Sequence, residues 1–483
     1  MFIYTTKTGD TLYEIGKRYG VSVEQIVLDN QISSPDKIVA GMDLVLPIDS
    51  ITHTVVRGDS LYKIARQYGV SVQGLISANP ELAMARYITP GMEIVVPLNS
   101  IKKLGDAEVN GYAYPTISDQ IVGQTAPYLT YMAMFSYQVK PDGTLYKIDT
   151  SRVLQQLPSY DVKPLMVITN IDDGGTFSSE LASGILHSTS VQEDLITNIL
   201  EILKQNNYFG LDVDFEYLYP DDRELYISFL QRLADAIKPE GYLLSVAVAP
   251  KISSTQQGTL YEAHDYNAIG KIVDRLIVMT YEWGYLYGPP LAVAPIGPVE
   301  QVLQYAVSEV DSRKILMGMP NYGYDWTLPY VSGKPARILT NVQAIDQAIK
   351  YGVNIQYDEK SQAPFYNYVD AQGRRHIVWF DNARSTYARL NLIKKYNLAG
   401  ASYWNLNSFF KQNWLVLDAM YNIVKKWCIY ANMFTKKVIE KWLFWYLISS
   451  VICKKIYNWK HCHNCCVATQ NSFAKAKWNC LLF

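Results

Sequence analysis

The chain has 483 residues, which at about 150 residues per domain predicts roughly three structural units. Hydrophobic residues make up 49% of the chain and charged residues 18%, a globular balance that excludes wholesale disorder. The 44 basic and 45 acidic residues give a formal net charge of −1, so the chain lacks the basic surplus that nucleic-acid binders need.

The first residues, MFIYTTKTGD, contain neither a basic segment nor a long apolar run. We therefore expect no secretory signal peptide. No apolar run reaches about 18 residues, and the longest candidate, 442–453, is too short to cross a bilayer. A membrane-spanning helix is not expected.

Two stretches near the N-terminus repeat each other. Residues 8–20 read TGDTLYEIGKRYG and residues 57–69 read RGDSLYKIARQYG, and the copies close on GMDLVLP and GMEIVVP. In each copy a short strand leads to Thr or Ser, which can cap a helix that ends at Gly. A Ser then starts a second helix, and an apolar strand follows. The pattern predicts a β-α-α-β module that occurs twice.

These repeats closely resemble LysM domains, over residues 2–48 and 52–98. The resemblance implies binding to chains that contain N-acetylglucosamine, such as peptidoglycan or chitin. In that family the glycan lies in a groove between the loop after the first strand and the loop after the second helix. The positions implied to form the two grooves are Gly9, Asp10, Thr11, Asn30 and Ile32 in the first copy, and Gly58, Asp59, Ser60 and Asn79 in the second.

A structural role for some of these side chains is the alternative. Asp10, Thr11 and Asn30 can serve as helix caps and turn residues. Because the family's groove uses backbone groups, a capping role for the side chains is compatible with glycan binding.

Residues 105–427 contain eight strand-like runs that alternate with helical patterns. The runs are Val109–Tyr114, Tyr128–Ser136, Lys163–Asn170, Gly210–Glu216, Tyr242–Ala249, Arg275–Tyr281, Lys314–Pro320 and Gly400–Asn405. A final helix is predicted at Trp414–Lys426. The alternation favours an α/β fold of the (β/α)8 TIM-barrel type, with the active site at the carboxyl ends of the strands. A doubly wound open sheet is the alternative.

The fourth run, GLDVDFEY at residues 210–217, carries the strongest chemical signal. Alternation places Asp212, Asp214 and Glu216 on one face, each about 6.6 Å beyond the last. In a barrel interior, desolvation and mutual repulsion disfavour ionising all three carboxyl groups. We therefore expect a raised pKa at Glu216, which suits a general acid near neutral pH.

This run resembles the DGxDxDxE signature of family 18 glycoside hydrolases, and the similarity extends over most of 105–427. MTYEW at 279–283 is similar to the family's M-x-Y motif, and residues 328–380 resemble the α+β insertion that many members carry after the seventh strand. Two positions depart from the family. Phe209 replaces the first acidic residue of the signature, which predicts altered tuning of the site, and residues 172–175 match the S-x-G-G motif only loosely.

The resemblance implies a retaining mechanism in which the substrate's own 2-acetamido oxygen attacks the anomeric carbon. Glu216 would protonate the glycosidic oxygen, Asp214 would orient the acetamido nitrogen, and Tyr281 would hold the acetamido carbonyl oxygen. Asp212 would tune Asp214. The implied substrate-binding residues are Trp404, under the scissile sugar, with Met279 and Glu282. No cofactor and no metal ion is implied.

Two LysM-like modules ahead of such a barrel look like the spore cortex-lytic group of bacterial enzymes, which are N-acetylglucosaminidases of modified peptidoglycan. Residues 279–296 are particularly similar to that group. The resemblance implies cleavage of β-1,4 bonds next to N-acetylglucosamine at the spore cortex or coat, with the cell wall as the alternative location. We expect a monomer. A chitinase and a catalytically silent glycan-binding protein are the alternative functions.

All six cysteines lie in residues 428–483, so a disulfide scaffold is excluded for the rest of the chain. This segment also holds eight Lys, no Arg and one acidic residue. The composition predicts an appended, poorly ordered tail outside the barrel core. Its HCHNCC run at 461–466 has the donors for zinc, but a second ligand pair at finger-like spacing is missing, and no metal site is expected.

Overall fold

The structure is a computed structural model of the chain that describes residues 1–83, 87–98 and 100–425. The predicted Cys-rich tail and its possible zinc donors lie outside the described residues. No helix in the described part of the chain is long and apolar enough to cross a membrane.

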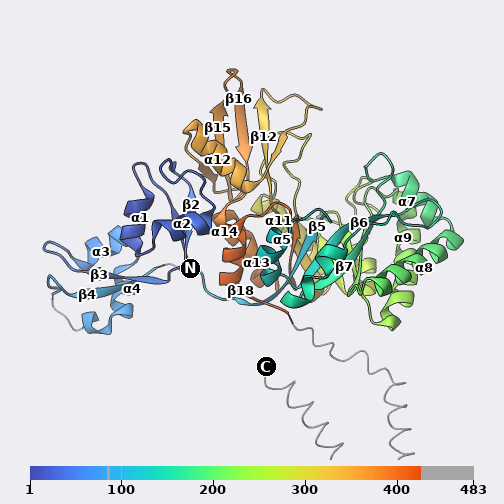
Figure 1. The fold of residues 1–483 in the computed structure, drawn as a ribbon, viewed down its shortest axis with the longest axis horizontal. Helices are drawn as coiled ribbons and strands as arrows, with labels where there is room; N and C mark the ends of the chain where they lie inside the picture. The colour runs from blue at the N-terminus through green and yellow to red at the C-terminus, as the bar shows by residue number, and fades with distance from the viewer. Residues whose placement is uncertain (84–86, 99, 426–483) are drawn as a thin grey trace, which may run out of the picture. The chain divides into compact units, whose positions relative to one another are not determined.

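Each N-terminal repeat folds as the predicted β-α-α-β unit, with its two strands paired antiparallel (Figure 1). The first module consists of β1 (Phe2–Thr5), α1 (Leu12–Tyr19), α2 (Val23–Asn30) and β2 (Asp43–Leu46). The second consists of β3 (Ser50–Thr54), α3 (Leu61–Tyr68), α4 (Val72–Ala78), the short helix η1 (Pro80–Ala83) and β4 (Glu93–Pro97). The hydroxyls of Thr11 and Ser60 cap α1 and α3, and the left-handed Gly20 and Gly69 end them.

The central part of the chain forms a closed barrel of eight parallel strands. The strands are β5 (Gly105–Ala113), β6 (Tyr131–Gln138), β7 (Lys163–Thr169), β8 (Gly210–Asp214), β9 (Leu243–Val248), β10 (Arg275–Val278), β11 (Ile315–Pro320) and β17 (Gly400–Trp404). Each pairs with the next, and β17 pairs with β5. The predicted TIM barrel is therefore confirmed, and the open-sheet alternative is wrong.

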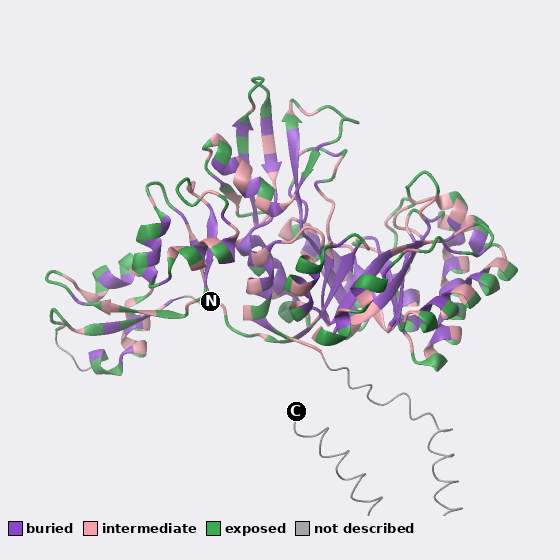
Figure 2. Cartoon of the chain, viewed as in Figure 1, coloured by how far each residue is buried: buried purple, intermediate pink, exposed green. Residues whose placement is uncertain are grey.

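Helices surround the barrel and bury its strands (Figure 2). They are α5 (Asp119–Thr125), α6 (Ser151–Leu154), α7 (Ser179–Leu186), α8 (Thr189–Gln205), α9 (Arg223–Ile237), α10 (Tyr266–Ile272), α11 (Ile296–Glu309), α13 (Ala383–Tyr396) and α14 (Lys411–Met420). Amphipathic periodicity explains this placement, because each long helix turns one apolar face towards the strands.

The predicted final helix, Trp414–Lys426, is wrong at its C-terminal end. Helix α14 stops at Met420, and the chain continues as the strand β18 (Tyr421–Ile423). This strand pairs in parallel with residues 105–107 of β5, which lie outside the register that β5 shares with β17. The extended backbone of β18 therefore pairs with backbone N–H and C=O groups of β5 that a longer helix would leave unpaired.

The predicted α+β insertion lies between β11 and α13. It contains a five-stranded antiparallel sheet in the order β13-β12-β16-β15-β14. Its elements are β12 (Gly323–Leu328), β13 (Arg337–Leu339), α12 (Asn341–Tyr351), β14 (Gln356–Asp358), β15 (Ala363–Val369) and β16 (Arg375–Trp379). The insertion therefore begins a few residues before the predicted 328–380.

The two LysM-like modules differ in their surroundings. One continuous apolar core joins the first module to the insertion, and it includes Ile26 from α2 and Ile349 from α12. The second module has a small core of its own. At equivalent positions of the two closing strands, Val45 is fully buried whereas Val95 is 41% exposed. The first module is therefore built into the body of the protein.

Candidate active site

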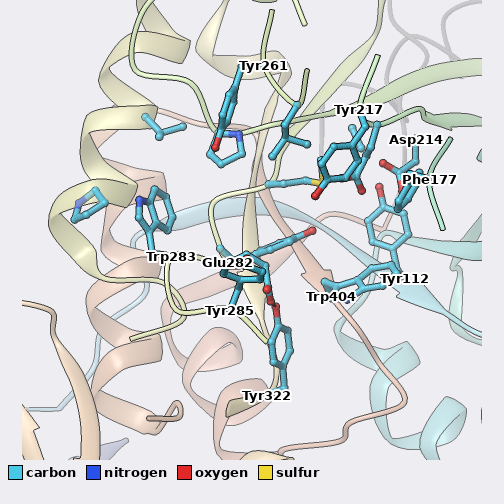
Figure 3. Close-up of a pocket in the computed structure, with 18 of the residues that line it drawn as sticks. Tyr112, Phe177, Asp214, Tyr217, Tyr261, Glu282, Trp283, Tyr285, Tyr322 and Trp404 are labelled. Carbon is cyan, nitrogen blue, oxygen red and sulfur yellow. Dashed lines mark hydrogen bonds between the residues drawn. The ribbon is translucent and has the colours of Figure 1, made fainter. Parts of the chain in front are cut away.

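A cleft of about 650 Å³ opens at the carboxyl ends of the barrel strands (Figure 3). Its walls are mainly aromatic, and they include Tyr112, Tyr114, Phe135, Tyr217, Tyr281, Tyr285, Tyr322 and Trp404. Its charged groups are the carboxyls of Asp214, Glu216 and Glu282, and no Lys, Arg or His of the described residues lines it. Flat aromatic faces beside hydrogen-bonding groups suit an uncharged sugar chain.

Strand β8 places its carboxyl groups inside the barrel by simple alternation. Phe215, on the opposite face, stacks on Tyr226 and Phe229 of α9, with ring centroids 6.2 and 6.0 Å away. The apolar face of the strand is thus fixed against a helix, and Asp212 and Asp214 are turned inward.

Asp212 lies beneath the cleft and is fully buried. Its carboxylate accepts hydrogen bonds from the Tyr112 hydroxyl, at 2.7 Å, and from the Ser245 hydroxyl. Burial raises the pKa of Asp212 to about 6, although both hydrogen bonds act in the opposite direction. Asp212 therefore contributes to the field at Asp214 and does not line the cleft.

Asp214 lines the cleft but is only 4% exposed. Burial, followed by the charges of Glu216 and Asp212, raises the pKa of Asp214 well above its usual range. Its Oδ1 atom accepts no hydrogen bond from the described residues. A buried carboxyl oxygen without a partner is costly, so this atom is ready to bind a donor group of a ligand.

Two side chains that the sequence analysis missed hold the segment that carries Glu216. The backbone N–H of Glu216 donates to Oδ1 of Asn170, at 2.9 Å, and Nδ2 of Asn170 donates to the Glu216 carbonyl, at 2.8 Å. Nε2 of His264 donates to the Phe215 carbonyl, while its Nδ1 accepts from the Ala249 N–H. Burial lowers the pKa of His264 to about 4, so this imidazole is a neutral structural clamp.

Glu216 follows the end of β8 and is partly open to the cleft. Burial and then the nearby Glu282 carboxylate raise the pKa of Glu216 to about 7. Glu282 accepts hydrogen bonds from the hydroxyls of Tyr322 and Tyr324, and Figure 3 shows Glu282 and Tyr322 pointing towards one another. A carboxyl group with a pKa raised in this way can donate and accept a proton near neutral pH.

The role of Glu282 in this balance can be measured with Glu282→Gln. Loss of the Glu282 charge should lower the pKa of Glu216, because one like charge no longer opposes its ionisation. The alkaline limb of the pH–rate profile should therefore move to lower pH. Tyr324→Phe is the control, because it removes a hydrogen-bond donor to Glu282 but keeps the charge. A limb that stays in place for Glu282→Gln would show that the two carboxyls do not interact.

The structure brings the other predicted barrel residues to the same cleft. Tyr281, Met279 and Trp404 all line it. Burial, followed by the charges of Asp214 and Glu216, raises the pKa of Tyr281 well above its usual range, so its hydroxyl remains a proton donor. The Trp404 ring makes edge contacts with Phe135 and Tyr112, at centroid distances of 4.8 and 5.5 Å.

Of the two positions that depart from the family motifs, Phe209 lies away from the carboxyls. Phe209 precedes β8 at the opposite end of the strand, about 16 Å along the backbone from Asp214. Its ring lies 6.2 Å from that of Tyr131. Residues 172–175 form a turn after β7, in which Gly175 takes a positive φ of 78°.

In the LysM-like modules, the predicted groove side chains brace their own loops. Asp10 accepts from the Tyr4 hydroxyl and the Lys7 N–H, and Asp59 accepts from the Val56 N–H and bonds to His53. Thr11 and Ser60 are helix caps, and Ile32 belongs to the apolar core. Asn30 and Asn79 are buried and bond to backbone groups of helix and strand. The loops that contain Gly9 and Gly58 keep exposed backbone.

Comparison with known proteins gives matches over most of the chain. The model of glycosyl hydrolases family 18 matches residues 111–408, and the LysM model matches residues 4–47 and 53–97. The chain is 44% identical over 433 residues to the cortical fragment-lytic enzyme of Bacillus subtilis (strain 168), covering 88% of this chain and 99% of the relative.

Solved structures give the same result. The spore cortex-lytic enzyme SleL of Bacillus megaterium QM B1551 aligns with a TM-score of 0.76 and 42% identity, covering 88% of this chain and 99% of that one. A chitinase from Chromobacterium violaceum ATCC 12472 aligns with a TM-score of 0.60 and 26% identity, covering 65% of this chain and 98% of that one.

Proposed function

The chain belongs to glycosyl hydrolase family 18, and from this premise we propose that it cleaves β-1,4 bonds next to N-acetylglucosamine in bacterial peptidoglycan. The observation that carries the proposal is the pairing of Glu216, whose pKa is raised to about 7, with the unpartnered oxygen of Asp214 in one aromatic cleft. Relatives named as cortex-lytic enzymes support the spore cortex as the site of action.

In the proposed mechanism, the protonated carboxyl of Glu216 donates its proton to the glycosidic oxygen as that bond to the anomeric carbon breaks. The carbonyl oxygen of the substrate's 2-acetamido group forms the new bond to this carbon, which gives a cyclic oxazolinium ion. Asp214 accepts from the acetamido N–H, and Tyr281 donates to the acetamido oxygen. The Glu216 carboxylate then removes a proton from a water molecule, which attacks the anomeric carbon and opens the oxazolinium ring. Because the anomeric carbon is substituted twice, its configuration is retained.

A thiazoline analogue of N-acetylglucosamine tests this mechanism. The analogue mimics the cyclic intermediate, so we expect competitive inhibition with an inhibition constant far below the KM of a comparable substrate. N-acetylglucosamine itself is the control. It lacks the fused five-membered ring of the intermediate and should bind weakly. A covalent sugar trapped on a protein carboxylate would instead support a mechanism with an enzyme nucleophile.

The substrate can be identified by digesting spore cortex, vegetative peptidoglycan and chitin side by side and weighing the fragments by mass spectrometry. The proposal requires fastest release from cortex, with N-acetylglucosamine at the new reducing ends. Chitin is the second candidate, since the cleft presents three carboxyls and no cation among the described residues and so suits a neutral glycan.

We also propose that the LysM domains hold the enzyme on the insoluble glycan, with the second domain as the removable tether. The segments that enter and leave this domain lie side by side. The Leu98 N–H donates to the Asp49 carbonyl at 3.0 Å, and Ser50 pairs with Pro97. Excision of 50–97 should strongly weaken adhesion to insoluble peptidoglycan and leave hydrolysis of short soluble fragments nearly unchanged. Pull-down and soluble-substrate assays measure the two effects, and equal losses in both would contradict a tethering role.

A further inference from the structure

A second cleft, of about 410 Å³, lies beside the first LysM domain and outside the barrel site. Two of its walls are residues 7–10, after β1, and residues 37–40, after α2. These are the two loops between which a LysM domain is expected to hold a glycan. The third wall belongs to the catalytic body, because Ile349, Gly352 and Asn354 of the insertion also line the cleft.

The contact that creates this third wall is close and direct. The Ile355 N–H donates to the Ala40 carbonyl, at 2.9 Å, and the Ser33 hydroxyl donates to Asp346. Gly41 takes a positive φ of 86°, and a Cβ at this position would lie 1.8 Å from the Ile355 carbonyl oxygen. At the equivalent Gly91 of the second domain, a Cβ would meet nothing within 4 Å. Among the described residues, the first domain therefore makes this close approach and the second does not.

The other side of the first domain is fixed to helix α14 and its neighbour. Nε2 of Gln412 donates to Oδ1 of the buried Asn30, at 3.0 Å, and Lys411 forms an ion pair with Asp29. Arg384 of α13 pairs with Asp43, whose side chain is fully buried. Breaking buried pairs of this kind is costly, so the first domain is fixed to the barrel helices as well as to the insertion.

The lining of the cleft suits an N-acetylated sugar. Ile38, Val39 and Ile349 supply apolar surface for a ring face or an acetamido methyl group. Gly9 and Gly352 expose backbone, and the side-chain amide of the exposed Asn354 can both donate and accept hydrogen bonds. Lys7 and Lys37 also line the cleft, and their ammonium groups can donate hydrogen bonds to hydroxyl and carbonyl oxygens of a sugar. The combined lining therefore suits an amido sugar.

We propose that the first LysM groove and the insertion form one composite site for a glycan chain containing N-acetylglucosamine, with Asn354 as a ligand-binding residue from the insertion. This inference rests on the proposed function, because it takes the glycan as the common ligand. A chain bound here is held at a fixed separation from the catalytic cleft. The first domain therefore orients the substrate, whereas the second tethers the enzyme.

The test uses the full chain, with chitohexaose as the probe and the catalytic cleft saturated with the thiazoline inhibitor. Isothermal titration should resolve binding at both LysM domains. Asn354→Ala should weaken one class of sites about threefold to tenfold, the contribution of one hydrogen bond, and Asn354→Trp should remove that class by filling the cleft. Gln356→Ala is the matched control, since Gln356 is exposed on the same insertion but does not line the cleft.

Unchanged stoichiometry and affinity in both Asn354 variants, with melting temperatures equal to that of the parent, would overturn the composite site. So would a parent chain that binds no chitohexaose once the cleft is filled. Turnover of a short soluble substrate, measured on the same protein preparations without the inhibitor, separates this result from failure of the proposed hydrolysis. Variants that lose binding but keep turnover support the inference, and loss of turnover in the parent would refute only the proposed activity.

Discussion

Glu216→Gln should abolish turnover and leave glycan binding nearly unchanged. The amide keeps the shape of the side chain and its backbone clamp to Asn170, but it cannot donate the proton that the leaving oxygen needs. General acid catalysis typically contributes about 10² to 10⁴-fold, so kcat on a soluble substrate should fall by at least that range. Binding of the thiazoline, measured by titration, should change little.

The control for this experiment is Gln256→Ala, which alters a cleft-lining side chain that takes no part in the proposed proton transfers. It should change KM more than kcat. A Glu216→Gln enzyme that retains more than a tenth of the parent kcat would show that another group supplies the proton.

The same assignment fixes the direction of the pH dependence. Glu216 must be protonated to act as the acid, and its pKa is raised to about 7. Turnover should therefore fall as the pH rises through about 7, because the reactive protonated fraction is lost. In Glu216→Gln any residual activity should lack this alkaline limb.

The barrel and the strand that carries Asp212 and Asp214 could be predicted because their signals are local. Alternation alone places Asp212 and Asp214 inside and Phe215 against α9, and eight such runs between helices favour a closed barrel. Strand ends were less predictable. Glu216 lies beyond β8, and Tyr421–Ile423 leave the helical pattern for a strand, because pairing with β5 outweighs helix propensity there.

The clamps around the site could not be predicted because they join residues far apart in the chain. Asn170 bonds to Glu216 across 46 positions and His264 bonds to Phe215 across 49. An Asn after a strand and a His in a loop are common in any sequence, so neither signals its partner. Tyr322, just before β12, and Tyr324, within it, hold Glu282, and in the same way neither tyrosine signals its partner in the sequence.

The unequal surroundings of the two LysM domains are equally hidden, because the repeats share one hydrophobic pattern. DLVLP and EIVVP both predict an apolar closing strand, yet every residue of β2 is buried whereas β4 alternates between exposed and buried. The difference lies in the surface that covers β2. A sequence pattern reports which residues can be buried, and not which neighbour buries them.

The largest expected effect on stability follows from this difference. Val45→Ala removes two methyl-sized groups from the apolar core that the first domain shares with the barrel, and should cost about 2 kcal/mol of unfolding free energy. Val95→Ala, at the equivalent but exposed position, should cost almost nothing. At about 2–4 °C per kcal/mol, the melting temperature should drop by several degrees for the first variant only. Calorimetry of the full chain measures both, and equal shifts would mean that the two domains are attached alike.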